Sequence, residues 1–363
     1  MMAPAFQNNT VKEFTCTSEN TYNMSLSETE RFYVYPKGHT FIVTIAFSVI
    51  LSVGILLNIA FIYVVVRIKS MRTVTNKYLI NLAIADIVFL TAAISEKLWR
   101  YSKSPVMGDH SPLGSTGCIG VYFLIDVTYF ASLTFITIVS LDRYFALCRP
   151  MDLDNPFKWN VNKIIVVTWI FAIVLGLILI PAYSNFNQYC VSWPNLEPFS
   201  HWPNAIAYCD AINAGFRDFV LLFQTIPFFV TFSLNLYIYV SIVRALNRWV
   251  SSQDNLRSAS TSHGHDNDAD RVRHQMAKMI IFNGVTFFIL LAPFELVSLI
   301  QLIGSLRGSD SGFIFVIVNS RLTLHVSRIL SYVNSAVNPL VYTIMCPAYL
   351  SAFKEALLPT FRR

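Results

Sequence analysis

The stretch FIVTIAFSVILSVGILLNIAFIYVVV, Phe41–Val66, contains 26 residues and no charged side chain. A helix of about 20 apolar residues crosses the hydrocarbon core of a bilayer, so this stretch is long enough to span a membrane. Further apolar stretches follow along the chain, and each is expected to form another span. The expected spans are residues 41–66, 78–99, 117–144, 163–183, 218–244, 277–304 and 322–346. The sequence therefore predicts an all-α membrane protein with a seven-transmembrane helix bundle.

The composition of the whole chain agrees with a membrane protein. Only 13% of the 363 residues are charged and 54% are hydrophobic, whereas soluble proteins carry about 25% charged residues. A soluble core cannot bury so much apolar surface, so lipid must cover part of it. The same composition excludes a collagen-like chain, a disordered chain and a small disulfide-rich scaffold.

Lysine and arginine predict the orientation, because they accumulate in the cytoplasmic segments of membrane proteins. With the N-terminus outside, the cytoplasmic segments hold 17 of the 27 basic residues: 67–77, 143–163, 244–278 and 347–363. We therefore expect a multi-pass plasma-membrane protein with an extracellular N-terminus. The N-terminal tail carries two N-glycosylation sequons, at Asn8 and Asn23.

The chain is expected to divide into three parts. Residues 1–39 form an extracellular tail, and residues 40–346 form the bundle, with cytoplasmic loop 3 at about 245–276. Residues 347–363 form a short amphipathic eighth helix and a cytoplasmic tail. Within loop 3, the polar segment 249–272 is typical of a mobile loop.

Several short motifs in a fixed order identify the chain with a family. Over about residues 40–357 it closely resembles the rhodopsin-like (class A) G-protein-coupled receptors, of the neuropeptide-receptor type. The motifs are Gly54 and Asn58, Asn81-Leu82-Ala83 with Asp86, Asp142-Arg143-Tyr144, Trp169, Pro227, Phe287 with Pro293, and Asn338-Pro339-Leu340-Val341-Tyr342. Any one of these would be weak evidence, but the ordered set is specific.

The resemblance implies a switch that couples the bundle to a heterotrimeric G protein. Arg143 would be held by Asp142 in the resting state and released on activation. The resemblance favours a q-type G protein and allows arrestin binding. The implied coupling and switch residues are Asp142, Arg143, Tyr144, Met151, Phe287, Pro293, Asn338, Pro339 and Tyr342.

A charge inside a membrane span is costly unless it faces protein or water. For Asp86, the resemblance implies a buried sodium pocket, formed by Asp86, Ser132, Asn334 and Asn338. This sodium ion would be an allosteric ion, and no other cofactor is expected. The alternative is a hydrogen-bonded polar network without an ion.

Single positions discriminate between classes of ligand. Tyr332 stands where an opsin needs a lysine for retinal, which excludes light sensing. Ile125 stands where an aminergic receptor has its aspartate. The acid of this chain is the next residue, Asp126, and it is rotated by about 100° around a helix.

Charges of both signs and several aromatic residues lie in the outer halves of the spans. Asp126 or Glu295 is expected to bind a basic group of a peptide, and Arg328 a carbonyl or carboxylate. The alternative is internal pairing, Glu295–Arg328 or Asp126–Arg328. The candidate ligand-binding residues are Glu96, Trp99, Tyr122, Asp126, Tyr129, Arg217, Phe294, Glu295, His325, Arg328 and Tyr332.

The loop at about 184–216 is long and aromatic, and suits an extended ligand. The resemblance implies a disulfide from Cys118 to this loop, and the position of Cys190 soon after the fourth span favours Cys190 as its partner. Cys209 could then pair with Cys16, which leaves Cys148 and Cys346 reduced on the cytoplasmic side.

The expected function is a cell-surface receptor for an extracellular neuropeptide. A receptor of the same fold for a lipid or another small chemosensory ligand is the alternative. A channel or transporter is a remote alternative, because the sequence lacks the repeats such proteins show. Catalytic signatures are absent from the sequence, so an enzyme is not expected, and neither is a nucleic-acid partner.

Overall fold

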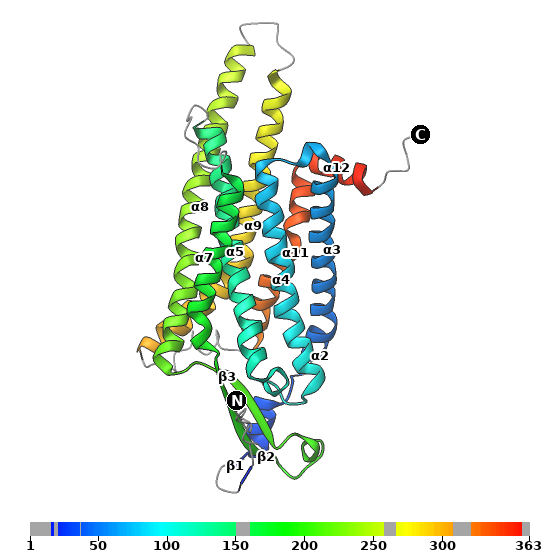
Figure 1. Ribbon diagram of the computed structural model, residues 1–363, viewed down its shortest axis with the longest axis vertical. Coiled ribbons are helices and arrows are strands. Elements are labelled where there is room, and N and C mark those ends of the chain that lie inside the picture. The colour runs from blue at the N-terminus through cyan, green and yellow to red at the C-terminus, as the bar shows by residue number, and fades with distance from the viewer. Residues whose placement is uncertain are drawn as a thin grey trace, which may run out of the picture.

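Long helices packed side by side form the body of the protein (Figure 1). The computed structural model describes residues 16–17, 21–36, 38–149, 160–257, 266–307 and 321–357. Seven long helices lie within these residues: α3 (Phe47–Arg67), α4 (Val74–Lys103), α5 (Gly114–Cys148), α7 (Val161–Leu179), α8 (Ala214–Arg257), α9 (Asp266–Arg307) and α11 (Arg321–Met345). The predicted seven-helix membrane bundle is confirmed.

Six of the described spans are long and apolar enough to cross a bilayer on their own. The seventh helix, α11, meets the same criterion only together with α12 (Pro347–Leu357), from which it is separated by a bend of 103°. The reason is the polar inner face of α11, which carries Arg328, Asn334 and Asn338. These side chains face other helices rather than lipid.

The helices differ in how much of their surface the bundle covers. About 72% of the apolar stretch of the α5 span is buried by the rest of the protein, against 22% for the α7 span. Helix α5 is therefore central in the bundle and α7 is peripheral. Large apolar side chains such as Leu56 and Ile289 remain exposed on the outer faces. Lipid would cover these faces in the membrane.

Small and polar residues hold α3, α4 and α11 close together. A Cβ atom on Gly54 would lie 2.5 Å from Leu90 Cδ1 and 3.0 Å from Ala336 Cβ, so any larger residue would require Leu90 or a neighbouring helix to shift. One turn later, Asn58 Nδ2 donates to the carbonyl oxygens of Gly54 and Ser335, at 2.9 and 3.0 Å. A buried amide that bridges two helices in this way fixes their relative position.

A small three-stranded sheet covers one end of the bundle, which is called the sheet end below (Figure 1). Strands β2 (Asn185–Ser192) and β3 (Ala205–Asp210) form an antiparallel hairpin. Strand β1 (Thr21–Asn23), close to the N-terminus, pairs with β2 in parallel. Short helices precede the first span: α1 (Leu26–Glu28) and α2 (His39–Phe41).

The structure corrects the predicted disulfide pairing. Cys118 pairs with Cys209, and Cys16 pairs with Cys190. Strand β2 leaves the bundle at Asn185, and Cys209 lies opposite Phe186, near the point where the hairpin returns. Cys190 is four residues further along β2, which at about 3.3 Å per residue places it about 13 Å from Phe186 and out of reach of Cys118. Closeness in sequence to the fourth span was therefore a wrong guide.

A second correction concerns the segment 249–272, which was expected to be a mobile loop. Helix α8 continues to Arg257 and α9 begins at Asp266, so most of this segment is helical. A polar sequence can extend an existing helix because nucleation has already occurred inside the bilayer. Residues 258–265 lie outside the described residues.

Candidate functional site

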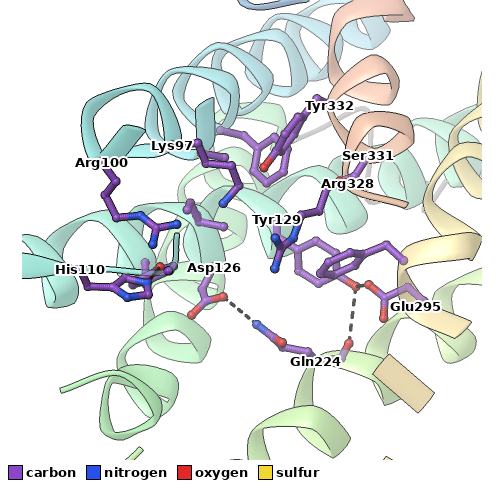
Figure 2. A pocket seen from close by; sticks show the side chains of 16 residues that line it. Lys97, Arg100, His110, Asp126, Tyr129, Gln224, Glu295, Arg328, Ser331 and Tyr332 are labelled. Carbon is purple, nitrogen blue, oxygen red and sulfur yellow. Dashed lines mark hydrogen bonds between the residues drawn. The ribbon is translucent and has the colours of Figure 1, made fainter. Parts of the chain in front are cut away.

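A cavity of about 410 Å³ opens between the helices at the sheet end. Side chains from five helices and from the loop after α4 line it, as Figure 2 shows. We call this cavity the main pocket. Its lining is Phe89, Ala93, Lys97, Arg100, Gly108, His110, Tyr122, Ile125, Asp126, Tyr129, Gln224, Phe294, Glu295, Arg328, Ser331 and Tyr332.

One part of the main pocket is acidic. Asp126 on α5 is buried, and its Oδ1 accepts a hydrogen bond from Gln224 Nε2 at 2.8 Å. Glu295 on α9 is 1% exposed, and its Oε1 accepts from the Tyr129 hydroxyl at 2.7 Å. The other carboxylate oxygen of Glu295 has no hydrogen-bond partner among the described residues. Both acids are therefore held by neutral donors.

A second group of lining residues is basic, and two of them are paired with one carboxylate. Glu96 is 3% exposed, and its two oxygens contact Lys97 Nζ at 3.1 Å and Arg100 Nε at 2.5 Å. Arg328 on α11 reaches into the same cavity and repels Lys97 electrostatically. Three cations thus share a single acid, which leaves this part of the pocket with net positive charge.

The loop between α4 and α5 completes the basic part. His110 Nε2 lies 3.1 Å from the Tyr122 hydroxyl, which donates to Glu96 Oε1 at 3.3 Å. Burial, and secondarily the Arg100 guanidinium, lower the pKa of His110 to about 4. His110 is therefore neutral at pH 7 and adds no charge to the pocket.

Seven of the predicted ligand-binding residues line the main pocket together. They are Tyr122, Asp126, Tyr129, Phe294, Glu295, Arg328 and Tyr332. Side chains of both charges that line one cavity without pairing with each other suit a ligand that carries complementary groups at two points. Each buried charge without an ionic partner is costly, and a ligand of opposite charge would lower that cost.

The other predicted residues lie elsewhere. Glu96 supports the basic part from behind, and His325 packs its ring 4.6 Å from that of His39 in a neighbouring cavity. Trp99 is 50% exposed and donates to the Pro112 carbonyl oxygen on the outer face of the bundle. The side chain of Arg217 lies outside the described residues.

The alternative, an ion pair of Arg328 with Asp126 or Glu295, is not formed among the residues that the structure describes; Gln224 and Tyr129 donate hydrogen bonds to the two acids. Arg100 and Gln224 were missed. The four-residue spacing from Glu96 to Arg100 places both side chains on one face of a helix, and it could have identified Arg100 as a pocket residue. Gln224 could have been identified because it is a polar residue close to Pro227 within an otherwise apolar span.

At the other end of the bundle, Asp142 and Arg143 form an ion pair of 2.8 Å. Asp142 Oδ2 also accepts from the Thr75 hydroxyl at 2.6 Å, which ties α5 to α4. Tyr342 is buried and lies beside Phe61, with ring centroids 5.2 Å apart. Met151 lies outside the described residues.

Between the two ends, Asp86 is fully buried in a group of polar residues. Its carboxylate accepts from Asn338 Nδ2 at 2.7 Å and from the Ser132 hydroxyl at 3.4 Å. The amide oxygen of the buried Asn334 has no hydrogen-bond partner among the described residues. Oxygen atoms of this kind are the ligands that a hard cation prefers.

Comparisons with known proteins agree with this arrangement. Residues 57–342 match the family model of the 7 transmembrane receptor (rhodopsin family). The chain is 26% identical to the thyrotropin-releasing hormone receptor of Bos taurus, over 85% of this chain and 75% of that protein. It is 26% identical to the pyrokinin-1 receptor of Drosophila melanogaster, over 87% and 79%. It is also 26% identical to the somatostatin receptor type 5 of Mus musculus, over 94% and 83%.

The family match covers most of the chain, including the central helix α5, the Asp142–Arg143 pair and the residues of the main pocket. The expected family is thereby confirmed. The chain belongs to the rhodopsin family of seven-transmembrane receptors, so it is a multi-pass plasma-membrane receptor and not an enzyme.

Proposed function

We propose that the protein is a cell-surface receptor that binds a neuropeptide in the main pocket and activates a heterotrimeric G protein. The observation that carries this proposal is that one pocket holds acidic and basic side chains that form no ion pair with each other among the described residues. The similar receptors for thyrotropin-releasing hormone, pyrokinin and somatostatin, all neuropeptide receptors, support a ligand of this class.

A peptide offers groups that match both parts. Its basic group would lie against Asp126 and Glu295, where Oε2 of Glu295 still has an open acceptor position among the described residues. Its carbonyl or carboxylate group would lie against Arg328. The aromatic residues Tyr122 and Tyr332 would contact apolar parts of the ligand. A lipid has a long apolar tail that would leave these buried charges unpaired, which disfavours the lipid alternative.

The orientation completes the proposal. The sheet end would face outside, and the end that carries Asp142 and Arg143 would face the cytoplasm, as the distribution of basic residues indicates. In the structure Arg143 is held by its neighbour Asp142. A peptide would act only through its differential affinity for a state in which Arg143 is free to contact the G protein. We favour a q-type G protein, with arrestin as a second cytoplasmic partner.

We further propose that the polar group around Asp86 holds a sodium ion. Asp86, Ser132 and Asn334 would supply oxygen ligands, with Asn338 orienting the Asp86 carboxylate. A bound cation would neutralise a buried charge at the point where α4, α5 and α11 meet, and so favour the packed arrangement of these helices.

The experiment is a screen of a peptide library and a lipid panel on cells that express the full-length receptor. Intracellular calcium and cyclic AMP are read together. We expect saturable responses to one or a few related peptides, with a calcium rise. The matched control is Arg143→Ala, which should retain surface expression but lose the response. Responses to lipids alone would contradict the neuropeptide proposal, and a cyclic AMP response without calcium would contradict the q type.

A further inference from the structure

The sheet that covers the main pocket has one face with a distinctive composition. Side chains alternate between the two faces of a strand, so residues two apart share a face. On β3 this places Tyr208 and Asp210 on the same face, and on β2 it places Asn187 and Tyr189 there. The register confirms the arrangement, because Asn187 lies opposite Tyr208.

Tyrosine rings on this face enclose a pocket of about 330 Å³, which we call the cap pocket. The ring of Tyr189 lies between those of Tyr22 and Tyr208, at centroid distances of 6.2 and 5.9 Å, with both neighbours tilted against it. Tyr33, which precedes the first span, adds a fourth ring and is hydrogen-bonded to Tyr208. Aromatic rings carry partial negative charge on their faces.

The charged group in the cap pocket is an acid. Asp210 lines the pocket and accepts one hydrogen bond, from Asn187 Nδ2 at 3.3 Å. It forms no ion pair with any residue that the structure describes, and no basic side chain belongs to the pocket lining. Four tyrosine rings thus line a pocket beside a carboxylate that has no ion-pair partner among the described residues, and both kinds of group attract a cation.

The cap pocket adjoins the main pocket through Tyr208. The ring of Tyr208 lies 6.1 Å from that of His110, and 3.8 Å from the position that a Cβ on Gly108 would occupy. Both His110 and Gly108 line the main pocket. Tyr208 therefore lies between the two pockets, and an extended ligand that occupies both would run beside this tyrosine.

The sheet is held firmly in place above the main pocket. The disulfides Cys16–Cys190 and Cys118–Cys209 attach it to the N-terminal segment and to α5. The buried Asp109 accepts a hydrogen bond from the Ala207 backbone at 3.0 Å, which links the loop after α4 to β3. A preformed site of this kind loses little entropy on binding.

We propose that the cap pocket binds an arginine or lysine side chain of the peptide whose other part occupies the main pocket. The proposal deepens the proposed function and rests on it for the identity of the ligand as a peptide. It adds a specific requirement, namely a basic residue outside the part that enters the bundle.

The first experiment tests the pocket without any agonist. Nα-acetyl-arginine methylamide and its neutral citrulline analogue are titrated by saturation-transfer NMR against full-length receptor in nanodiscs. The receptor carries Asp126→Asn and Glu295→Gln, so that the acids of the main pocket do not contribute. We expect saturable binding of the arginine compound alone, lost in Asp210→Asn. Glu197→Gln, on the same loop but outside the pocket, should retain it. Equal binding of citrulline, or binding that survives Asp210→Asn, would overturn the proposal.

The second experiment uses the peptide agonist identified in the library screen. Each of its basic residues is replaced in turn by citrulline or norleucine, and the potency is measured in cells. One replacement should lower the potency about tenfold on the wild-type receptor, as expected for a cation–π contact with an added carboxylate. The loss should largely vanish on Asp210→Asn and persist on Glu197→Gln.

The two experiments distinguish a failure of the cap-pocket proposal from a failure of the proposed receptor function. An agonist without a basic residue, or a loss of potency that is undiminished on Asp210→Asn, would overturn the cap-pocket proposal while leaving the receptor function intact. If no peptide activates the receptor, the proposed function fails, and the NMR titration still decides whether the cap pocket binds a cation.

Discussion

The hydroxyl group of Tyr239 occupies the space where a side chain at Gly284 would stand. A Cβ on Gly284 would lie 1.7 Å from the Tyr239 hydroxyl oxygen, which is far closer than any non-bonded contact allows. The same hydroxyl lies 2.9 Å from the Ser140 hydroxyl. Tyr239 thus joins α8, α9 and α5 near the end that carries Arg143, and holds them in the packed arrangement seen here.

We predict that Gly284→Ala raises signalling in the absence of ligand. The added methyl group cannot coexist with the Tyr239 hydroxyl in its present position, so either the Tyr239 side chain leaves Ser140 or α9 moves away from α8. Either change loosens the packing near Arg143. The measurement is basal G-protein activation per receptor at the cell surface, read with both inositol phosphate and cyclic AMP. Gly120→Ala is the matched control, because nothing lies within 4 Å of a Cβ at that position.

Tyr239→Ala should itself raise basal signalling, because it removes the contact with Ser140. Gly284→Ala should add nothing further in that background, because the methyl group then has room. Unchanged basal signalling in a Gly284→Ala receptor that reaches the surface normally would show that this contact does not hold the resting state. The combined variant also shows whether any loss of expression arises from the clash itself.

The disulfide pairing can be read directly by mass spectrometry. Digestion of unreduced receptor should yield peptides that join Cys118 to Cys209 and Cys16 to Cys190, and reduction should separate them. The same digestion should find Cys148 and Cys346 as free thiols. A peptide that joins Cys118 to Cys190 would mean that the hairpin β2–β3 has another register.

Acid should weaken the fold through His110. Burial and the nearby Arg100 lower the pKa of His110 from 6.5 to about 4. Between these two values the unfolded chain binds a proton at this histidine and the folded chain does not, so stability falls as the pH falls through that window. One proton corresponds to about 1.4 kcal/mol per pH unit at most.

Thermal unfolding of purified receptor at neutral pH and at about pH 5 measures this effect. The melting temperature of the wild type should drop more between the two conditions than that of His110→Asn, because the variant has no group at this position to protonate. Equal drops in the two proteins would show that His110 titrates normally in the folded state.

Asn23 provides a test of the orientation. Its side chain is exposed on β1 at the sheet end, where an extracellular glycan could attach. We expect N-glycosidase treatment of receptor from mammalian cells to increase its gel mobility. The Asn23→Gln variant should show a smaller increase, because it lacks one of the two glycans. Asn8→Gln should remove the other. Glycosylation is confined to the lumenal side of the secretory pathway, so an unmodified Asn23 would count against an extracellular sheet end.

The fold could be predicted from the sequence because its main constraint is local. A bilayer requires about 20 apolar residues in each span, and such stretches can be recognised one at a time. The same holds for the two acids of the main pocket. Asp126 and Glu295 stand out because a charge within a span must face protein or water, and the structure places both in one cavity.

The features that could not be predicted depend on the path of the chain outside the bilayer. The pairing of Cys118 depends on the direction in which β2 leaves the bundle, and position in the sequence does not specify that direction. Strand β1 and the cap pocket combine segments about 170 residues apart. The partners of Asp126 and Glu295 depend on the rotamers of Gln224 and Tyr129, which compete with Arg328 in space and not in sequence.

The central claim is that the two parts of the main pocket bind groups of opposite charge on one peptide. The most direct measurement combines ligand and receptor changes. The agonist is prepared with its basic main-pocket group replaced by a neutral isostere, and separately with its carboxylate or carbonyl group blocked. Both forms are compared with the parent peptide on the wild type, Asp126→Asn and Arg328→Gln.

We predict that loss of the basic group lowers the potency tenfold to about a hundredfold on the wild type, the range expected for charged hydrogen bonds, and has little effect on Asp126→Asn. Loss of the carboxylate or carbonyl group should likewise matter on the wild type and not on Arg328→Gln. The loss of potency caused by removing the basic group should persist on Arg328→Gln. The loss caused by blocking the carboxylate or carbonyl group should persist on Asp126→Asn. Surface expression of both variants should be unchanged. If both variants weakened all forms of the peptide by the same factor, the charges of the pocket would be structural and the account would be wrong.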